Sequence, residues 1–325
     1  MFSVIIPLYN KQENIAKTVE SVLSQTYQEF ELIIVNDGST DNSLEVVKNF
    51  NTNRLKLYSI ENSGVSAARN YGIGKAKYPY IALLDADDYW RPNYLALAKE
   101  VISTYKDVQM MAFAYYRVIN GINEELNFGL KHQFDTGRIN NYFELMLLSN
   151  NSMITSSSVI ISKLLFNKVG LFNEKLKYGE DLEMWFRLLS ETDFFFVNKN
   201  LVFYNFDGQD RACDKFFDLE SDLVFHLDVF SNLEKRSINA KKYLDLFRLQ
   251  KLKTYHLNTK YSSQVRSILL NVDKDNLGYK WKLFYSLPVN ILRPLYHMFF
   301  YLKHKIIKPA FVYLKFNKIK CTDER

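Results

Sequence analysis

Residues 1–90 alternate short apolar runs with segments of helical pattern, and this alternation constrains the fold more than any other feature of the sequence. The apolar runs are Val4 to Ile6, Leu32 to Val35, Leu55 to Ile60 and Ile81 to Leu84, and the helical segments are Lys11 to Gln25, Asp41 to Phe50 and Ser63 to Lys77. Continuous apolar runs of this length are typical of strands that are covered on both faces. We therefore predict a mainly parallel sheet with helices above and below it.

Beyond residue 90 the order of the predicted elements becomes irregular. The pattern predicts a helix from Pro92 to about Tyr105, strands over Gln109 to Ile119 and Ser156 to Ile161, and a helix over Glu180 to Leu189. Some of these strands are expected to be antiparallel, which makes the sheet mixed. From about residue 210 the pattern is helical to the end. The predicted fold class is thus α/β, with one domain over residues 1–210 and a helical C-terminal region over 211–325.

The composition indicates a chain that is packed over most of its length. It has 47% apolar and 15% aromatic residues but only 11 glycines. The two cysteines, Cys213 and Cys321, have no second cysteine or histidine at ligand spacing, which argues against a zinc site or disulfide framework and favours a reducing compartment. Because Met1 to Pro7 lacks the basic region and the length of a signal peptide, we expect a cytoplasmic protein.

The positive charge is concentrated near the C-terminus. The formal net charge is +6, yet Lys280 to Lys320 carries nine Lys and Arg residues and no acidic residue, so the rest of the chain is net acidic. A nucleic-acid-binding protein would be expected to spread basic residues over its functional face. No nucleic-acid partner is therefore predicted.

Polar residues follow three of the predicted strands, at Tyr9-Asn10, Asn36 to Ser39 and Asp85 to Asp88. Open parallel sheets bind ligands at the carboxyl ends of their strands. Three carboxylates within four residues, in Asp85 to Asp88, repel one another unless a cation lies between them, and Mg²⁺ or Mn²⁺ with bound phosphates is the natural partner. The alternative is a solvated turn in which Asp88 caps a helix that opens near Pro92.

A dinucleotide-binding Rossmann domain is not predicted, because no G-x-G-x-x-G follows the first strand. The nearest match, Gly72-Ile73-Gly74, is interpreted as a helix ending or a tight turn. A fold without a glycine cradle must neutralise a pyrophosphate in another way, and a metal ion held by Asp87 would do so.

Six sequence motifs, in this order along the chain, resemble those of a known protein family. They are S-V-I-I-P-L-Y-N (Ser3 to Asn10), S-V-L-S-Q-T-Y (Ser21 to Tyr27), I-V-N-D-G-S-T-D (Ile34 to Asp41), N-S-G-V-S-A-A-R-N (Asn62 to Asn70), L-L-D-A-D-D (Leu83 to Asp88) and G-E-D-L-E-M-W (Gly179 to Trp185). With this set, residues 2–210 resemble the family 2 glycosyltransferases, whose catalytic domain has the Rossmann-like GT-A fold. Any one motif would be weak, but their order and spacing together are highly specific.

The resemblance implies a site for a nucleoside diphosphate sugar. Pro7 and Tyr9 would line the nucleoside pocket with the Tyr9 ring against the base, Asp37 would accept a hydrogen bond from the base, and Arg69 would face the nucleotide. Asp85 would contact the ribose or sugar. Asp87 would bind the Mn²⁺ or Mg²⁺ ion that stabilises the departing diphosphate. Taken alone, Tyr9 would be interpreted as a core aromatic and Arg69 as a surface residue of a helix.

The resemblance also implies that Asp181 is the catalytic base of an inverting transfer, which takes the proton of the acceptor hydroxyl. In isolation, Glu180-Asp181 at a helix start would be interpreted as charge that complements the helix dipole. Trp185, one turn further on, would either shape the acceptor pocket or lie in the core. Family members often carry a histidine after a late strand as a further ligand. Asp207 lies nearest that position here, so it is a possible third ligand.

Aromatic and basic residues interleave over the tail from Leu277 to Lys320. Pro288, Arg293, Pro294 and His297 interrupt its only long apolar stretch, so we predict no uninterrupted spanning helix. An interfacial helix on the inner membrane surface is predicted instead, with a helix packed on the catalytic domain as the alternative. A membrane-bound tail would favour a lipid-linked acceptor.

The sequence therefore predicts an inverting, metal-dependent transferase. It would move a hexose or N-acetylhexosamine from a nucleoside diphosphate donor, foremost UDP, to a glycan or lipid-linked glycan in surface polysaccharide synthesis. The sequence leaves two alternatives. A sugar nucleotidyltransferase would need a glycine-rich basic loop, which Pro7 to Asn10 is not. A non-catalytic membrane scaffold of the same fold would not need Asp85, Asp87 and Asp181.

Overall fold

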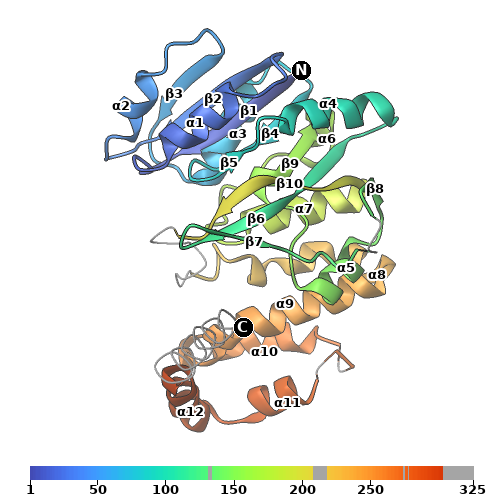
Figure 1. Cartoon of the computed structure of the whole chain (residues 1–325). Helices are drawn as coiled ribbons and strands as arrows, with labels where there is room; N and C mark the ends of the chain where they lie inside the picture. The colour runs from blue at the N-terminus through green and yellow to red at the C-terminus, as the bar shows by residue number, and fades with distance from the viewer. Residues whose placement is uncertain (131–133, 208–217, 274, 277, 303–325) are drawn as a thin grey trace, which may run out of the picture. The chain divides into compact units, whose positions relative to one another are not determined.

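The computed structural model of the chain describes residues 1–130, 134–207, 218–273, 275–276 and 278–302. The chain divides into two compact units, residues 1–240 and 241–325. The boundary predicted at residue 210, and both cysteines, lie outside the described residues. The first unit contains all strands of the described residues and the candidate site (Figure 1).

A ten-stranded mixed sheet forms the centre of the first unit (Figure 1). Its strands are β1 (Phe2–Leu8), β2 (Phe30–Asp37), β3 (Leu55–Ile60), β4 (Tyr80–Leu83), β5 (Tyr89–Trp90), β6 (Met110–Ile119), β7 (Ile122–Glu125), β8 (Thr136–Ile139), β9 (Val159–Ser162) and β10 (Phe194–Asn205). The strand order is β3-β2-β1-β4-β9-β6-β10-β5, with β7 on β6 and β8 on β10. The predicted mixed, mainly parallel sheet is confirmed.

The helices of the first unit flank this sheet (Figure 1). They are α1 (Ile15–Leu23), α2 (Ser43–Lys48), α3 (Val65–Lys75), α4 (Tyr94–Thr104), α5 (Tyr142–Ser149), α6 (Lys163–Val169), α7 (Glu180–Glu191) and α8 (Ser231–Arg236), with short 3₁₀ turns η1 (Ser156–Ser158), η3 (Leu223–Phe225) and η4 (Leu227–Phe230). Every residue of β1 and β2 is buried, as strands covered on both faces require.

Strand direction brings distant parts of the chain to one edge of the sheet. Strands β1 to β4 are mutually parallel, β9 runs against both β4 and β6, and β10 is parallel to β6. The carboxyl ends of β1, β2, β4, β6 and β10 therefore share one edge, and the entry to β9 lies there as well. The chain order reverses between β1 and β4, which is where open α/β sheets bind ligands.

Gly72-Ile73-Gly74 lies at the C-terminal end of α3, which ends at Lys75, so its interpretation as a helix ending is confirmed. A Cβ at Gly72 would lie 2.5 Å from Cγ2 of Ile5. The glycine is therefore needed for the close approach of α3 to β1. Asp88 does not cap the helix after Pro92, because α4 begins at Tyr94 with Asn93 as its N-cap.

The second unit is helical, as predicted. It contains most of α9 (Ile238–His256), then η5 (Thr259–Tyr261), α10 (Ser262–Leu270), α11 (Tyr279–Ser286) and α12 (Val289–Leu302). Pro294 lies inside α12, and the helix continues past it. Among the described residues, none of the helices combines the length and the apolar character needed to cross a membrane.

Candidate active site

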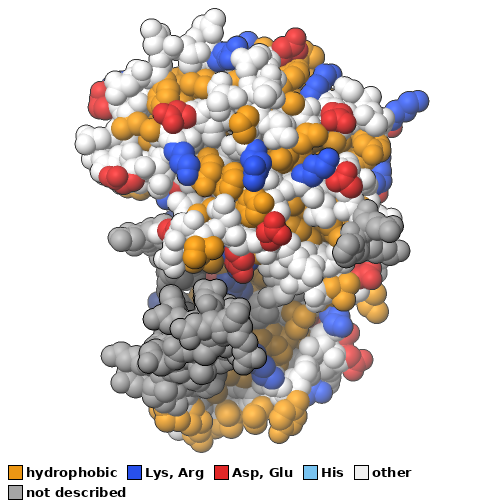
Figure 2. All heavy atoms as spheres, in the orientation of Figure 1, with side chains coloured by type: hydrophobic (Ala, Val, Ile, Leu, Met, Phe, Trp, Pro, Cys, Tyr) orange, Lys and Arg blue, Asp and Glu red, His pale blue; other side chains and the backbone are white. Residues whose placement is uncertain are grey.

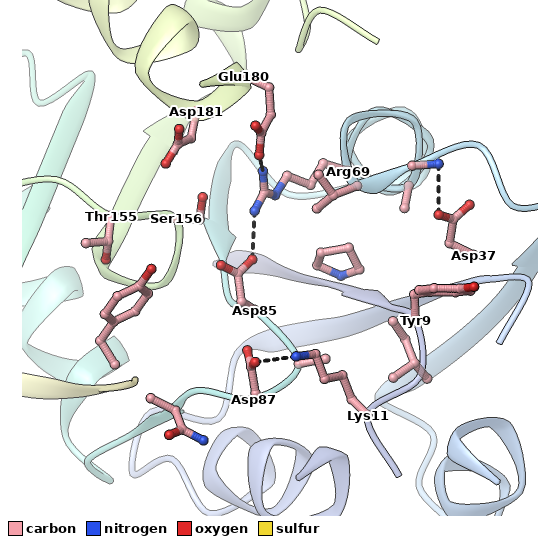
Figure 3. Close-up of a pocket in the computed structure, with 18 of the residues that line it drawn as sticks. Tyr9, Lys11, Asp37, Arg69, Asp85, Asp87, Thr155, Ser156, Glu180 and Asp181 are labelled. Carbon is pink, nitrogen blue, oxygen red and sulfur yellow. Dashed lines mark hydrogen bonds and ion pairs between the residues drawn. The ribbon is translucent and has the colours of Figure 1, made fainter. Parts of the chain in front are cut away.

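A cleft of about 750 Å³ opens at the edge where the parallel strands end (Figure 3). It is lined from the end of β1, the end of β2, the start of α3, the loop after β4, the end of β6, the segment before β9, the start of α7 and the end of β10. Eight residues singled out in the sequence line this one cleft: Pro7, Tyr9, Asp37, Arg69, Asp85, Asp87, Glu180 and Asp181.

Tyr9 and Asp37 lie together on one side of the cleft (Figure 3). The Tyr9 side chain is 46% exposed, so it is not a core aromatic. The buried carboxylate of Asp37 accepts hydrogen bonds from the backbone N–H groups of Ser63 at 2.7 Å and Gly64 at 2.9 Å. These bonds fix the loop that leads into α3, while each oxygen keeps a second lone pair for a ligand.

Arg69 joins the two sides of the cleft. Its buried guanidinium forms ion pairs with Asp85 at 2.8 Å and with Glu180 at 3.4 Å. Figure 3 shows it between these two carboxylates. The surface interpretation of Arg69 is wrong, and its direct contact with a nucleotide stays a prediction. Its visible effect is to hold the loop after β4 against the start of α7.

Asp87 has a charged partner from the segment after β1. The Lys11 ammonium lies 2.5 Å from its carboxylate, and both side chains are partly exposed. Within the part of the chain that the structure describes, no group of three or more His, Cys, Asp or Glu residues could hold a metal ion. An ion held by the Asp87 carboxylate, substrate phosphates and water fits the usual binding of Mg²⁺. The donor set is therefore compatible with a divalent cation, which would displace Lys11 from Asp87.

Glu180 and Asp181 are the first two residues of α7. The chain just before this helix is held by a backbone bridge between Tyr178 and Asp222. Gly179 has φ +78°, and a Cβ there would lie 2.8 Å from Cβ of Leu223, so this bend requires glycine. Burial and the Asp181 carboxylate raise the pKa of Glu180 to about 7 against the opposing effect of Arg69. Burial also raises the pKa of Asp181, again against Arg69. Half-buried carboxylates whose pKa is raised in this way are suited to accept a proton.

Asp88 is a site-shaping residue whose role the sequence did not reveal. It is 1% exposed, and burial together with Asp87 and Asp85 raises its pKa well above the usual range. One oxygen is hydrogen-bonded by the Ser157 hydroxyl, and that hydroxyl also accepts the N–H of Asp85 at 3.0 Å. The other oxygen accepts the N–H of Asn205. Asp88 thus fixes the loop that carries Asp85 and Asp87.

The remaining two predicted residues do not line the cleft. Trp185 is fully buried and packs edge-on against Phe172, so the core alternative holds for it. Asp207 accepts hydrogen bonds from the backbone N–H groups of Asn120 at 2.6 Å and Gly121 at 3.2 Å. Both of these residues have positive φ in the turn between β6 and β7. Asp207 therefore stabilises a hairpin turn, and its role as a third ligand stays a prediction.

Comparisons with known proteins agree with this geometry. Residues 3–164 match the sequence profile described as Glycosyl transferase family 2. An uncharacterized glycosyltransferase of Rickettsia typhi is 30% identical over 204 residues, which cover 62% of this chain and 63% of that protein. This chain therefore spans less than two thirds of that relative.

Two further relatives are aligned over more of their own length. Glycosyltransferase GlyG of Streptococcus pneumoniae is 29% identical over 251 residues, which cover 73% of this chain and 79% of GlyG. WfgD of Escherichia coli is described as a UDP-Glc:alpha-D-GlcNAc-diphosphoundecaprenol beta-1,3-glucosyltransferase. It is 27% identical over 223 residues, which cover 68% of this chain and 83% of WfgD.

A solved structure shares the fold. Residues 1–349 of S. aureus TarS, crystallised with UDP-GlcNAc, superpose with a TM-score of 0.64 at 19% identity, covering 85% of this chain and 82% of the TarS chain. At this identity the likeness shows the fold alone, and it confirms the predicted GT-A class.

Proposed function

Because the chain belongs to Glycosyl transferase family 2, we propose that it is an inverting transferase that uses a nucleoside diphosphate sugar. The sugar would be a hexose or an N-acetylhexosamine, and the acceptor would be a hydroxyl of a glycan. One observation carries this proposal: Asp85 and Asp87 line one cleft together with the half-buried Asp181, although nearly a hundred residues separate them in the chain. Donor carboxylates and a proton acceptor can therefore act on one bound molecule.

In this proposal the donor occupies the side of the cleft formed by β1, β2 and β4. The exposed ring of Tyr9 stacks on the base, Asp37 accepts a hydrogen bond from it, and Asp85 contacts the ribose or sugar. Asp87 would hold a divalent cation, which when bound neutralises the diphosphate as a Lewis acid. Arg69 keeps Asp85 in place through their ion pair.

Asp181 completes the reaction from the other side. The acceptor oxygen attacks the anomeric carbon opposite the leaving group while Asp181 takes the hydroxyl proton. The bond from the anomeric carbon to the diphosphate oxygen breaks, and the nucleoside diphosphate leaves with the bonding electron pair. The raised pKa of Asp181 supports this role, because a base is most effective when its pKa lies near the working pH.

UDP is proposed as the nucleotide and a lipid-linked glycan as the acceptor. Support comes from the names of similar proteins: TarS was solved with UDP-GlcNAc, and WfgD is described as acting from UDP-Glc on a diphosphoundecaprenol-linked sugar. A role in surface polysaccharide synthesis would follow from such an acceptor.

Attachment to the cytoplasmic face of the membrane is proposed for α11 and α12. Tyr279, Leu283, Ile291, Leu295 and Met298 are exposed on these helices. Figure 2 shows hydrophobic side chains gathered over this segment. Lys280, Lys282 and Arg293 add positive charge, and no acidic residue lies between Tyr279 and Leu302.

A thermal-shift panel of UDP, GDP and ADP, each with and without Mn²⁺, tests the donor assignment. We expect stabilisation by UDP that increases when Mn²⁺ is present, since a ligand that binds only the folded state raises its stability. Indifference to every nucleotide would contradict the proposal.

A further inference from the structure

We propose that Arg117 binds a phosphate group of the acceptor, so that the acceptor side of the cleft selects glycans attached to a phosphate or diphosphate. This inference rests on the proposed function, because it assigns the part of the same cleft that the donor leaves free. Arg117 lies near the end of β6 and lines the cleft with Tyr204 of β10, which is its register partner.

The guanidinium of Arg117 is held in one orientation by three neighbours. It lies over the Phe206 ring, 4.9 Å from the ring centroid. Its Nη2 donates to Oδ1 of Asn151 at 3.2 Å, and its Nη1 lies 3.4 Å from a carboxylate oxygen of Glu124. The contact with the ring leaves the N–H donors at the edge of the guanidinium accessible to polar partners, and the side chain is 27% exposed.

Arg117 differs from the other cations that line the described part of the cleft in the carboxylate with which it pairs. Lys11 pairs with Asp87, and Arg69 pairs with Asp85 and Glu180, so both are committed to carboxylates of the cleft itself. The partner of Arg117, Glu124, belongs to the exposed strand β7, is 51% exposed and does not line the cleft. An exposed ion pair of this kind is weak, so a bound anion can replace Glu124.

The other charged residues of the cleft are mostly acidic, so an acceptor with a negative charge needs a cation such as Arg117 in order to bind. Asp85, Asp87, Glu180 and Asp181 would repel a phosphate brought in with the acceptor sugar. A neutral glycan would meet no such repulsion and would need no cation. Arginine also matches the geometry of phosphate oxygens with paired N–H donors.

Aromatic rings provide the sugar-binding surface beside Arg117. Tyr178, Tyr204 and Phe206 line the cleft and are partly exposed, and the buried Tyr115 packs against Tyr204. The Tyr204 ring centroid lies 5.9 Å from that of Tyr115 and 5.4 Å from that of Phe206. Such apolar faces suit the C–H faces of a pyranose ring, which would place the sugar on the rings and its phosphate at Arg117.

Calorimetry on UDP-saturated protein with excess Mg²⁺ tests the inference, because UDP blocks the donor side. The probes are inorganic pyrophosphate, N-acetylglucosamine 1-phosphate and methyl α-N-acetylglucosaminide. We expect both phosphate-bearing probes to bind more tightly than the methyl glycoside. Arg117→Met should weaken only the phosphate-bearing probes, by about tenfold, as the loss of a charge-assisted pair implies. Glu124→Gln removes the competing carboxylate and should tighten them by about twofold to fivefold.

The outcomes separate this inference from the proposed function. Unchanged UDP affinity in both variants shows that they are folded and that the donor side is intact. If UDP binds but the phosphate probes bind no better than the methyl glycoside, or bind Arg117→Met as well as the wild type, the assignment of Arg117 is overturned while the proposed function stands. If UDP does not bind the wild type, the proposed function itself fails.

Discussion

The carboxylate of Asp88 accepts a 2.7 Å hydrogen bond from the backbone N–H of Asn205 and so joins the loop after β4 to the end of β10. The loop after β4 carries Asp85 and Asp87, which are proposed to bind the sugar donor. The end of β10 carries aromatic residues of the cleft. A buried carboxyl that receives a backbone N–H and a serine hydroxyl acts as a rigid link between two strand ends. The geometry of the whole cleft therefore depends on a residue that does not line it.

Replacing Asp88 tests this link. Asp88→Leu leaves the Asn205 N–H and the Ser157 hydroxyl buried without their partner, which should lower the free energy of unfolding by about 1–3 kcal/mol for each unpaired group. UDP affinity should fall as well, because the loop with Asp85 and Asp87 loses its anchor. Asp88→Asn keeps the shape and one acceptor oxygen, so its losses should be smaller. Urea unfolding and UDP titration measure both effects, and unaltered UDP affinity in Asp88→Leu would contradict the anchoring role.

Replacing Asp181 separates catalysis from binding. Asp181→Asn should lower kcat by about 10²–10⁴-fold, the usual contribution of a positioned general base, with little change in donor KM. The matched control on the same helix is Glu191→Gln, since Glu191 is exposed and pairs with Lys168 outside the cleft. Steady-state release of UDP in the presence of acceptor gives both constants. A kcat of Asp181→Asn within threefold of the control would exclude Asp181 as the base.

The raised pKa of Glu180 predicts that its contribution to the free energy of unfolding decreases as the pH rises. Its pKa in the folded protein is raised to about 7 from an ordinary value of 4.5, chiefly by burial. The folded state therefore holds a proton that the unfolded chain releases, so the contribution of Glu180 to stability is present below pH 4.5 and is lost as the pH rises towards 7. Glu180→Gln should flatten this part of the profile. Chemical unfolding of both proteins at half-unit steps from pH 4.5 to 8 measures the difference, and parallel profiles would rule out the raised pKa.

Replacing Asp87 and replacing Asp207 should have different effects on the stabilisation of the UDP complex by Mn²⁺. Asp87→Ala removes the carboxylate that faces the cleft, so the extra stabilisation that Mn²⁺ gives to the UDP complex should disappear. Asp207→Ala should keep the Mn²⁺ response, because Asp207 is bonded to the turn at Asn120 and Gly121. Thermal shifts with UDP over a Mn²⁺ titration compare the two. Loss of the Mn²⁺ response in Asp207→Ala would return this residue to the metal site.

Local sequence patterns were sufficient for the first four strands and the helices between them. The apolar run Leu55 to Ile60 is β3 itself, and the other predicted elements lie within a few residues of the observed ones. Strands β1 and β2 are buried along their whole length, so each of these runs reports its own environment, and the partly buried β3 keeps enough apolar residues to be recognised. The strand-end motifs were also predictable, because parallel strands bring their carboxyl ends to one edge.

The pairing of distant segments was not predictable from local pattern. Arg69 was placed at a nucleotide, but α7 brings Glu180 beside it from 111 residues away. Asp207 was placed at a metal because of its position after a late strand, but β10 pairs with β6 and carries it to the β6–β7 turn. Arg117 lies in a strand of mixed pattern, and only this same pairing brings it beside Phe206. Such assignments depend on tertiary register, which a single sequence does not contain.

The proposed membrane contact makes a prediction for α12. Ile291, Leu295 and Met298 are spaced i, i+4, i+7 and are 47–56% exposed, so they form one apolar face. Replacing all three by serine in the full chain should weaken binding to phosphatidylglycerol vesicles by at least about tenfold, because a fully buried apolar side chain contributes about 1.5–3 kcal/mol and about 1.4 kcal/mol already corresponds to a factor of ten. Leu270→Ser is the matched control, since Leu270 on α10 is 86% exposed but lies outside this face. Equal flotation of the triple variant and the control would reject α12 as the membrane contact, and binding that persists with neutral phosphatidylcholine vesicles would reject the contribution of Lys280, Lys282 and Arg293.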